Sequence, residues 1–273
     1  MCIKRNGIIY LNENITLTKT LTINQDCNII GGNDICINNI TDNIKIINNA
    51  KLHFNNIHFT SPDGILQILN NNYMVINRSI LDENINIHNN GELMAQRNFI
   101  YGTCTGAQSD LNNNWWGSNT PKYNVDTHIV LQVEPINKPA VISEEVTFIG
   151  KMIGSNGREY ILPEANFTFG ADSGYFSIDT GKTVNHQIET NYFDAEKEGQ
   201  IYFTIDNETA TCDVYSYERK TEVILDEIQL VENFEGVLNG LLRISNIDIY
   251  VTGSNSKFLS SDIITEFRGR GED

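Results

Sequence analysis

The sequence predicts an all-β chain with a right-handed parallel β-helix, an immunoglobulin-like β-sandwich and a partial C-terminal β segment, in that order. Three observations lead to this prediction. The first part of the chain carries a weak repeat of about 20 residues, which is typical of a solenoid. The middle part has short strand-like runs between turn signals, at the spacing of a sandwich. Between these parts, both tryptophans of the chain lie in one short motif, Asn113–Asn119.

The repeat is defined by three segments that align without gaps, each preceded by an Asn-Asn pair. They begin at Ala50, Asn72 and Gly91, so their offsets are 22 and 19 residues. Apolar residues recur on either side of a polar corner, which indicates two short strands per segment. A leucine-rich repeat has a similar period, but no helix-like run of ten residues occurs here. Stacking in register is expected to place two sets of apolar residues inside the solenoid, namely Leu52, Met74 and Leu93, and Phe54, Ile76 and Ala95.

Asparagine marks the extent of the predicted solenoid. It occurs 27 times in the first 125 residues and 10 times in the remaining 148. Because the rungs of a β-helix stack in register, Asn amides at the corners can hydrogen-bond along the stack. We expect the β-helix and its cap to occupy residues 1–134, with about five rungs and with weaker rungs or an N-terminal cap before residue 48.

Trp115 and Trp116 are adjacent, and adjacent residues of a strand point to opposite faces. The two rings are therefore expected to lie apart. They are either ordinary core aromatics or, as we prefer, a cap on the last rung, with Gly117 and Pro121 turning the chain away. One ring would cover the end of the solenoid core while the other contacts the strand predicted at Val125–Val133 or the linker after it. If exposed, the pair would instead be a platform on which a ligand such as a sugar stacks.

Residues 138–216 contain eight short strand-like runs and are expected to form the immunoglobulin-like sandwich. Residues 217–273 show further strand-like runs at Thr221–Leu225, Ile228–Val231 and Ile249–Val251. The stretch between the second and third of these runs is ambiguous between strand and helix. These strands are too few to close a sandwich, so we interpret the last segment as a partial or decayed second immunoglobulin-like repeat.

Charge and hydropathy limit the possible partners. The net charge is −16, and residues 137–273 account for −13 of it. Such a surface repels phosphate backbones and anionic lipid heads, which argues against binding to nucleic acid or to a membrane surface. Residues 1–19 have no apolar core of signal-peptide length, and no stretch approaches a membrane span. We expect no export signal, anchor or membrane insertion in this chain.

The five cysteines, Cys2, Cys27, Cys36, Cys104 and Cys212, are odd in number and lack the spacing of a metal site. A disulfide scaffold is unusual at this length and density. Buried thiols are the favoured interpretation, and a Cys27–Cys36 disulfide across a loop is the alternative.

The sequence shows no clustered chemistry. Asp82 and Glu83 are the only adjoining acids of the predicted solenoid, and successive residues there diverge. His53 and His58 alternate outward and are interpreted as solvated, because a metal site needs three or four converging ligands. We therefore expect no catalytic residue, no cofactor and no metal.

Five stretches carry a resemblance to a known family: Gly7–Leu11, Leu21–Ile23 with Asn28–Gly31, Asn48–Phe59, Asn113–Asn119 and Tyr192–Val214. Over residues 1–216 the chain resembles the adhesin-like surface proteins of methanogenic archaea. These proteins combine β-helix repeats of the pectin-lyase-like superfamily, an Asn-Trp-Trp-Gly region and immunoglobulin-like repeats.

The resemblance implies a non-catalytic protein of the cell surface or the extracellular space. Its β-helix would present a binding face on an immunoglobulin-like stalk, with glycans or proteins of neighbouring cells as partners. Pectin-lyase-like β-helices also include polysaccharide lyases and hydrolases, so a carbohydrate-active enzyme is the alternative.

Overall fold

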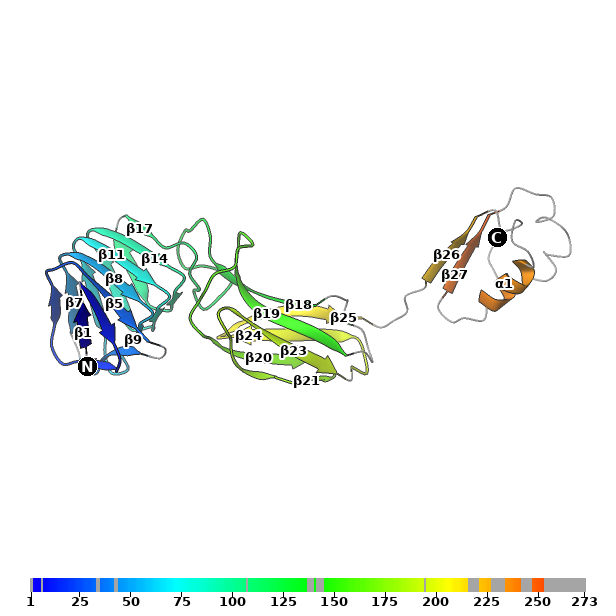
Figure 1. Cartoon of the computed structure of the whole chain (residues 1–273), viewed down its shortest axis with the longest axis horizontal. Coiled ribbons are helices and arrows are strands. Elements are labelled where there is room, and N and C mark those ends of the chain that lie inside the picture. The colour runs from blue at the N-terminus through cyan, green and yellow to red at the C-terminus, as the bar shows by residue number, and fades with distance from the viewer. Residues whose placement is uncertain are drawn as a thin grey trace. The chain divides into compact units, whose positions relative to one another are not determined.

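The computed structural model describes residues 2–5, 7–32, 35–41, 44–106, 108–136, 140, 145–193, 195–215, 221–226, 234–241 and 247–252 (Figure 1). The chain divides into two units, residues 1–215 and 216–273. The first unit contains a parallel β-solenoid followed by two antiparallel sheets, which confirms the predicted all-β class and the solenoid for this part.

Three sheets form the solenoid, and we name them faces A, B and C. Face A contains β1 (Cys2–Arg5), β2 (Ile8–Leu11), β5 (Cys27–Gly31), β8 (Lys51–Asn55), β11 (Tyr73–Asn77), β14 (Glu92–Gln96) and β17 (Ser109–Asp110). Face B contains β3 (Ile15–Leu17), β6 (Cys36–Asn39), β9 (His58–Thr60), β12 (Ile80–Leu81) and β15 (Phe99–Ile100). Face C contains β4 (Leu21–Ile23), β7 (Lys45–Asn48), β10 (Leu66–Asn70), β13 (Ile85–Asn89) and β16 (Thr103–Gly106). All neighbouring strands pair in parallel except β1, which is antiparallel to β2.

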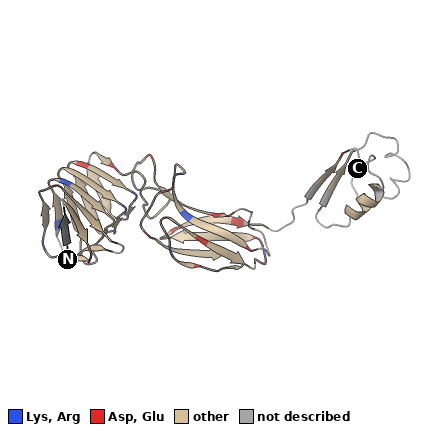
Figure 2. Cartoon of the chain, viewed as in Figure 1, with Lys and Arg blue, Asp and Glu red and all other residues tan. Residues whose placement is uncertain are grey.

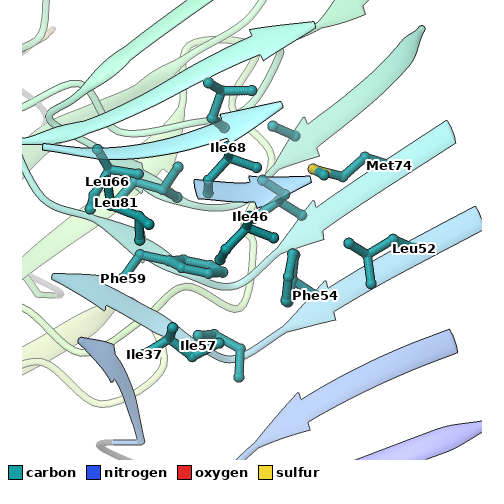
Figure 3. Close-up of a cluster of buried hydrophobic side chains, with 14 of the residues drawn as sticks. Ile37, Ile46, Leu52, Phe54, Ile57, Phe59, Leu66, Ile68, Met74 and Leu81 are labelled. Atoms are coloured by element: carbon teal, nitrogen blue, oxygen red, sulfur yellow. The ribbon is translucent and has the colours of Figure 1, made fainter. Parts of the chain in front are cut away.

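The predicted register is confirmed at its central rungs. Met74 pairs with Leu52 on one side and with Leu93 on the other. Ile76 likewise pairs with Phe54 and Ala95. All six side chains are at most 1% exposed, and Figure 3 shows Leu52, Phe54 and Met74 in the buried cluster. Alternation along each strand therefore delivers one continuous apolar core, because every second residue points inward.

Asparagine amides line a buried corner between faces C and A. Asn48 Nδ2 donates to Asn70 Oδ1 at 2.8 Å, and Asn70 Nδ2 donates to Asn89 Oδ1 at 2.7 Å. The three side chains are at most 3% exposed. Each buried amide thus forms a hydrogen bond with the amide on the next rung, so its polar atoms are not left unpaired. This explains why asparagine is concentrated in this part of the chain.

A second corner, between faces A and B, is held by residues with positive φ. Asn56, Arg78, Arg97 and Asn113 have φ between 51° and 60° and occupy equivalent places on successive rungs. This left-handed conformation turns the chain sharply, and asparagine adopts it more readily than most residues. The repeated conformation keeps this corner at two residues in each central rung.

Rung length varies at the connection from face B to face C. This connection has five residues at 61–65, three at 82–84 and two at 101–102. The connections from face C to face A at 71–72 and 90–91 have two residues each. The unequal offsets of the sequence repeat therefore arise on one side of the solenoid, and the register of the strands is unaffected.

The two-sheet domain follows the solenoid and buries one aromatic core between its sheets. One sheet contains β18 (Ile129–Pro135), β19 (Val146–Gly154), β23 (Gln187–Phe193) and β21 (Tyr175–Phe176). The other contains β22 (Thr180–Lys182), β20 (Asn166–Ala171), β24 (Gly199–Ile205) and β25 (Glu208–Val214). All pairings within them are antiparallel. A Cβ at Gly150 would lie 2.5 Å from the ring of Phe203, so glycine is required for this packing.

One domain boundary differs from the sequence analysis. The strand expected at Val125–Val133 was placed with the solenoid, within residues 1–134. The observed strand β18 pairs along its whole length with β19 and belongs to the two-sheet domain. The difference arises because alternation predicts a strand but does not identify its pairing partner.

The described part of the second unit contains a helix between two parallel strands. Its described elements are β26 (Thr221–Leu225), α1 (Phe234–Leu241) and β27 (Ile247–Val251), and the two strands are parallel. Phe234 and Leu238 lie one turn apart on α1 and pack with Leu225, Ile249 and Val251. An immunoglobulin-like repeat is built mainly from antiparallel pairs, so these described elements give the predicted partial repeat no support. The strand expected at Ile228–Val231 lies outside the described residues.

Candidate functional site: the tryptophan junction

The tryptophan motif forms the last turn of face B. Trp115 pairs with Phe99 as a parallel bridge, one position beyond the end of that sheet. Asn114 Oδ1 accepts hydrogen bonds from Asn98 N at 2.9 Å and from Asn98 Nδ2 at 3.1 Å, which fixes the register. Trp116 follows the inward row of face B, whose previous member is Ile100. As alternation predicts, the two indoles lie in different clusters.

Trp115 points out of the solenoid and into the core of the two-sheet domain. Its side chain is 0% exposed and shares a cluster with Ile129 and Leu131 at the start of β18. Its Nε1 donates a hydrogen bond of 2.7 Å to Asp206 Oδ2. Asp206 has a φ of 54° in the turn between β24 and β25. Trp115 therefore joins the two parts by apolar packing and by a charge-assisted hydrogen bond.

Two carboxylates, Asp206 in the turn between β24 and β25 and Glu208 at the start of β25, accept hydrogen bonds from the end of the solenoid. Tyr101 Oη donates to Asp206 Oδ2 at 2.8 Å. Burial, followed by the charge of Asp206, raises the pKa of Tyr101 well above its usual range, so the phenol remains a donor. Glu208 Oε2 accepts from Ser118 Oγ at 2.9 Å and from Asn119 N at 3.0 Å.

Trp116 covers the last rung of the solenoid core. Its side chain is 3% exposed, and its ring centroid lies 5.0 Å from that of Tyr123. Its Nε1 has no hydrogen-bond partner among the described residues, and the contacts described for this ring are packing contacts. Neither indole offers an open face on which a sugar could stack, because both are buried.

The remaining residues considered in the sequence analysis are placed differently. His53 is exposed, with its ring centroid 5.9 Å from that of Tyr73, and Glu83 is also exposed. His58 is not simply solvated, because its Nε2 lies 2.8 Å from Asp82 Oδ1. Within the described ranges, no group of three or more His, Cys, Asp or Glu side chains could hold a metal ion.

The cysteines whose side chains the structure describes are thiols. Cys27, Cys36, Cys104 and Cys212 form no disulfide, so the alternative of a Cys27–Cys36 bridge is wrong. Cys104 is buried, and burial raises the pKa of its thiol to about 12. The other three are half-buried, whereas the sequence analysis favoured full burial.

Two clefts open on the first unit. One, of about 380 Å³, is bordered by solenoid residues that include His58 and Arg78 and by residues of the two-sheet domain that include Glu164 and Lys182. The other, of about 480 Å³, lies at the first rungs and is lined mainly by apolar side chains such as Leu17. Neither cleft includes a tryptophan among its lining residues.

Comparisons with known proteins give partial matches. A family model described as an AAA domain matches residues 178–273. An uncharacterized protein of Haemophilus influenzae is 40% identical over 55 residues, which are 20% of this chain and 14% of that protein. Domains 4 and 5 of the S-layer protein SbsC cover 32% of this chain and 53% of their own at 12% identity, with a TM-score of 0.23. That score is too low to support an argument about the fold.

The AAA-domain match covers parts of both units. The two parts differ in how closely their structure resembles the elements of a nucleotide-binding domain. Residues Thr180–Thr183 read Thr-Gly-Lys-Thr, like the end of a phosphate-binding loop. They lie in and just after β22, an exposed antiparallel strand, whereas a phosphate-binding loop connects a strand to a helix. The second unit fits better, because β26, α1 and β27 have the order and parallel pairing of a β-α-β unit.

Two polar residues follow the parallel strands of the second unit. Asp226 comes directly after β26, and Thr252 comes directly after β27. Thr252 Oγ1 donates to Asp226 Oδ1, and Thr252 N donates to Leu225 O at 2.9 Å. Both side chains thus lie at the carboxyl ends of parallel strands, where α/β sheets bind their ligands.

Proposed function

We propose that residues 1–215 are a non-catalytic, adhesin-like surface module. The solenoid presents a binding face, and the two-sheet domain is an immunoglobulin-like stalk. The tryptophan junction is the observation that carries this proposal. It links the solenoid end to the stalk through a shared apolar core and two carboxylates, which suits a module that must keep its binding face oriented.

Face A is the surface that we assign to binding. Its strands align side chains in outward rows, one of which contains Lys51, Tyr73 and Glu92. A second row contains His53, Val75 and Met94. Rows with the strand spacing of about 4.8 Å form a flat, repetitive surface, which suits an extended polymer such as a glycan or a peptide segment.

The negative charge of the two-sheet domain argues against nucleic acid as a partner. Residues 129–215 carry 14 Asp or Glu and 5 Lys or Arg, and Figure 2 shows acidic residues on several strands of the two-sheet domain. An acidic surface repels phosphate backbones. Glycans or proteins of neighbouring cells remain the proposed partners, at the cell surface or in the extracellular space. No helix within the described part of the chain is long and apolar enough to cross a membrane.

The proposal predicts binding without turnover. The full chain should bind one or more polysaccharides or surface proteins on an array, without releasing reducing ends or unsaturated sugars. Tyr73→Ala on face A should weaken that binding roughly tenfold, as the loss of one well-packed aromatic contact does. The matched change Gln67→Ala on face C should leave binding unchanged. Release of sugar products by the wild-type chain would favour the alternative, a carbohydrate-active enzyme.

A second function is supported for residues 216–273 by the β-α-β arrangement and the AAA-domain match. We propose that this unit provides the residue that binds the Mg²⁺ ion of a nucleotide-binding site. Asp226, directly after β26, would hold Mg²⁺ in the manner of the Walker-B aspartate of P-loop NTPases. Its position after β26 and its hydrogen bond with Thr252 support this assignment.

Nucleotide titration tests the second function. The full chain should bind a fluorescent ATP analogue in the presence of Mg²⁺, and Asp226→Asn should abolish that binding. Lys182→Ala should have no effect, because Lys182 lies on β22 of the other unit. Absence of binding by the wild-type chain, or its loss in Lys182→Ala, would contradict the assignment.

A further inference from the structure

Three side chains form a row on the outside of face B. Cys36 at the start of β6 pairs in register with His58 at the start of β9. His58 pairs in turn with Ile80 of β12, and Asp82 follows that strand directly. The solenoid therefore brings a thiol, an imidazole and a carboxylate together from three successive rungs. We call these three residues the thiol row.

The two neighbours of His58 lie on opposite nitrogens of its ring. Cys36 Sγ is 3.7 Å from His58 Nδ1, and Asp82 Oδ1 is 2.8 Å from His58 Nε2. A metal ion needs ligand atoms that converge on one point, which this arrangement does not provide. A nucleophile, a base and a group that orients the base are instead connected in sequence.

We propose that the thiol row is a reactive-thiol site that exchanges with small disulfides. His58 Nδ1 takes the proton of Cys36, and Asp82 holds the ring in place and stabilises the imidazolium that forms. Thiolate is the nucleophilic form of cysteine, so the row increases the reactivity of Cys36 at neutral pH. Asp82 is a positioning residue in this scheme because it acts through His58.

The surroundings of the row allow access to small reagents. The side chains of His58 and Asp82 are 34% and 36% exposed, and Cys36 is half-buried. The cleft of about 380 Å³ borders His58. Its other charged lining residues are Arg78, Glu164 and Lys182, and Lys182 Nζ lies 3.9 Å from Glu164 Oε2. His58 is the one member of the thiol row that lines this cleft, so a small disulfide in the cleft would lie beside the imidazole, next to Cys36.

The exchange balances without any further reactant. The Cys36 thiolate attacks one sulfur of the disulfide, a new S–S bond forms and the original S–S bond breaks. The departing thiolate receives the proton that His58 took from Cys36. The products are Cys36 in a mixed disulfide and one small thiol.

The first test uses 5,5′-dithiobis(2-nitrobenzoate) on the full chain, followed by peptide mapping of the modified cysteines. Cys36 should react at least about tenfold faster than Cys212 and Cys104, whose pKa values are raised by burial. Cys36→Ser should remove the fast phase of reagent release. A fast phase that persists in Cys36→Ser, or a Cys36 peptide that is modified no faster than the Cys212 peptide, would overturn the proposal.

The second test separates proton transfer from simple exposure. His58→Gln should slow the reaction of Cys36 about tenfold at neutral pH, and Asp82→Asn should slow it less. In both variants the rate should rise at alkaline pH towards that of a simple thiol. His88→Gln, at an exposed histidine on β13 of face C, is the matched control and should leave the rate unchanged. Circular dichroism confirms folding of each variant; an unchanged rate in folded His58→Gln, or in folded Asp82→Asn at every pH, would refute the assigned roles.

Discussion

Trp115→Ala is expected to lower the free energy of unfolding of the first unit by about 3–5 kcal/mol, as truncation of a buried indole does. The ring is fully buried between Phe99 of the solenoid and Ile129 and Leu131 of the two-sheet domain. Its removal leaves a cavity and takes one donor from Asp206, which Tyr101 still contacts. Guanidinium denaturation followed by circular dichroism measures the effect. Because the cavity lies where the two parts meet, unfolding should also separate into two transitions.

The hydrogen bond of Trp115 can be separated from its packing by comparing two conservative variants. Trp115→Phe loses the hydrogen bond to Asp206, whereas Trp116→Phe loses none that involves the described part of the chain, where Trp116 Nε1 has no partner. Trp115→Phe should therefore cost more, by about 1.5–3 kcal/mol, the range for hydrogen bonds to charged groups. Equal costs would show that the carboxylate contributes nothing at the junction.

Asn70→Ala is expected to destabilise the solenoid by about 1–3 kcal/mol for each buried partner that it leaves unsatisfied. Its amide donates to Asn89 Oδ1 and to Glu92 O, and its carbonyl oxygen accepts from Asn48. Asn71 is the matched control, because it makes an equivalent side-chain ladder with Asn49 and Asn90 on the exposed side of the same corner.

Asn71→Ala should change the free energy of unfolding by no more than about 0.5 kcal/mol, because the exposed amides of Asn49 and Asn90 can hydrogen-bond to water instead. Thermal or urea unfolding of both variants gives the comparison. A similar decrease in the free energy of unfolding in Asn70→Ala and Asn71→Ala would contradict this explanation. Burial of the hydrogen-bonded amides would then make no difference to stability.

The sequence predicts the solenoid well because its signals are local and repeated. Alternation around Met74 and Ile76 identifies the inward residues, and the offsets between segments identify which of them stack. The same offset of 22 residues relates Cys36 to His58, so the repeat could have predicted that these two residues pair on neighbouring rungs. It was missed because the aligned segments begin at Ala50, after Cys36.

Other features could not be predicted because they depend on distant contacts. Asp206 lies 91 residues after Trp115, and nothing in the spacing identifies a turn acid as the partner of an indole. In the second unit, α1 has only eight residues and includes glycines, so its periodicity cannot be distinguished from that of a short strand. Alternation likewise does not predict the parallel pairing of β26 with β27, because it identifies strands and not the direction in which they pair.

The variable connection between faces B and C suggests how such a solenoid acquires new properties. Residues 61–65, 82–84 and 101–102 differ in length while the strands on either side keep their pairing. Lengthening a surface loop costs little, since the entropy of closure grows slowly with length. Mutation can therefore enlarge one rim of the molecule without disturbing its core. A peptide grafted between Ser61 and Ile65 should be displayed there by a scaffold that folds as before.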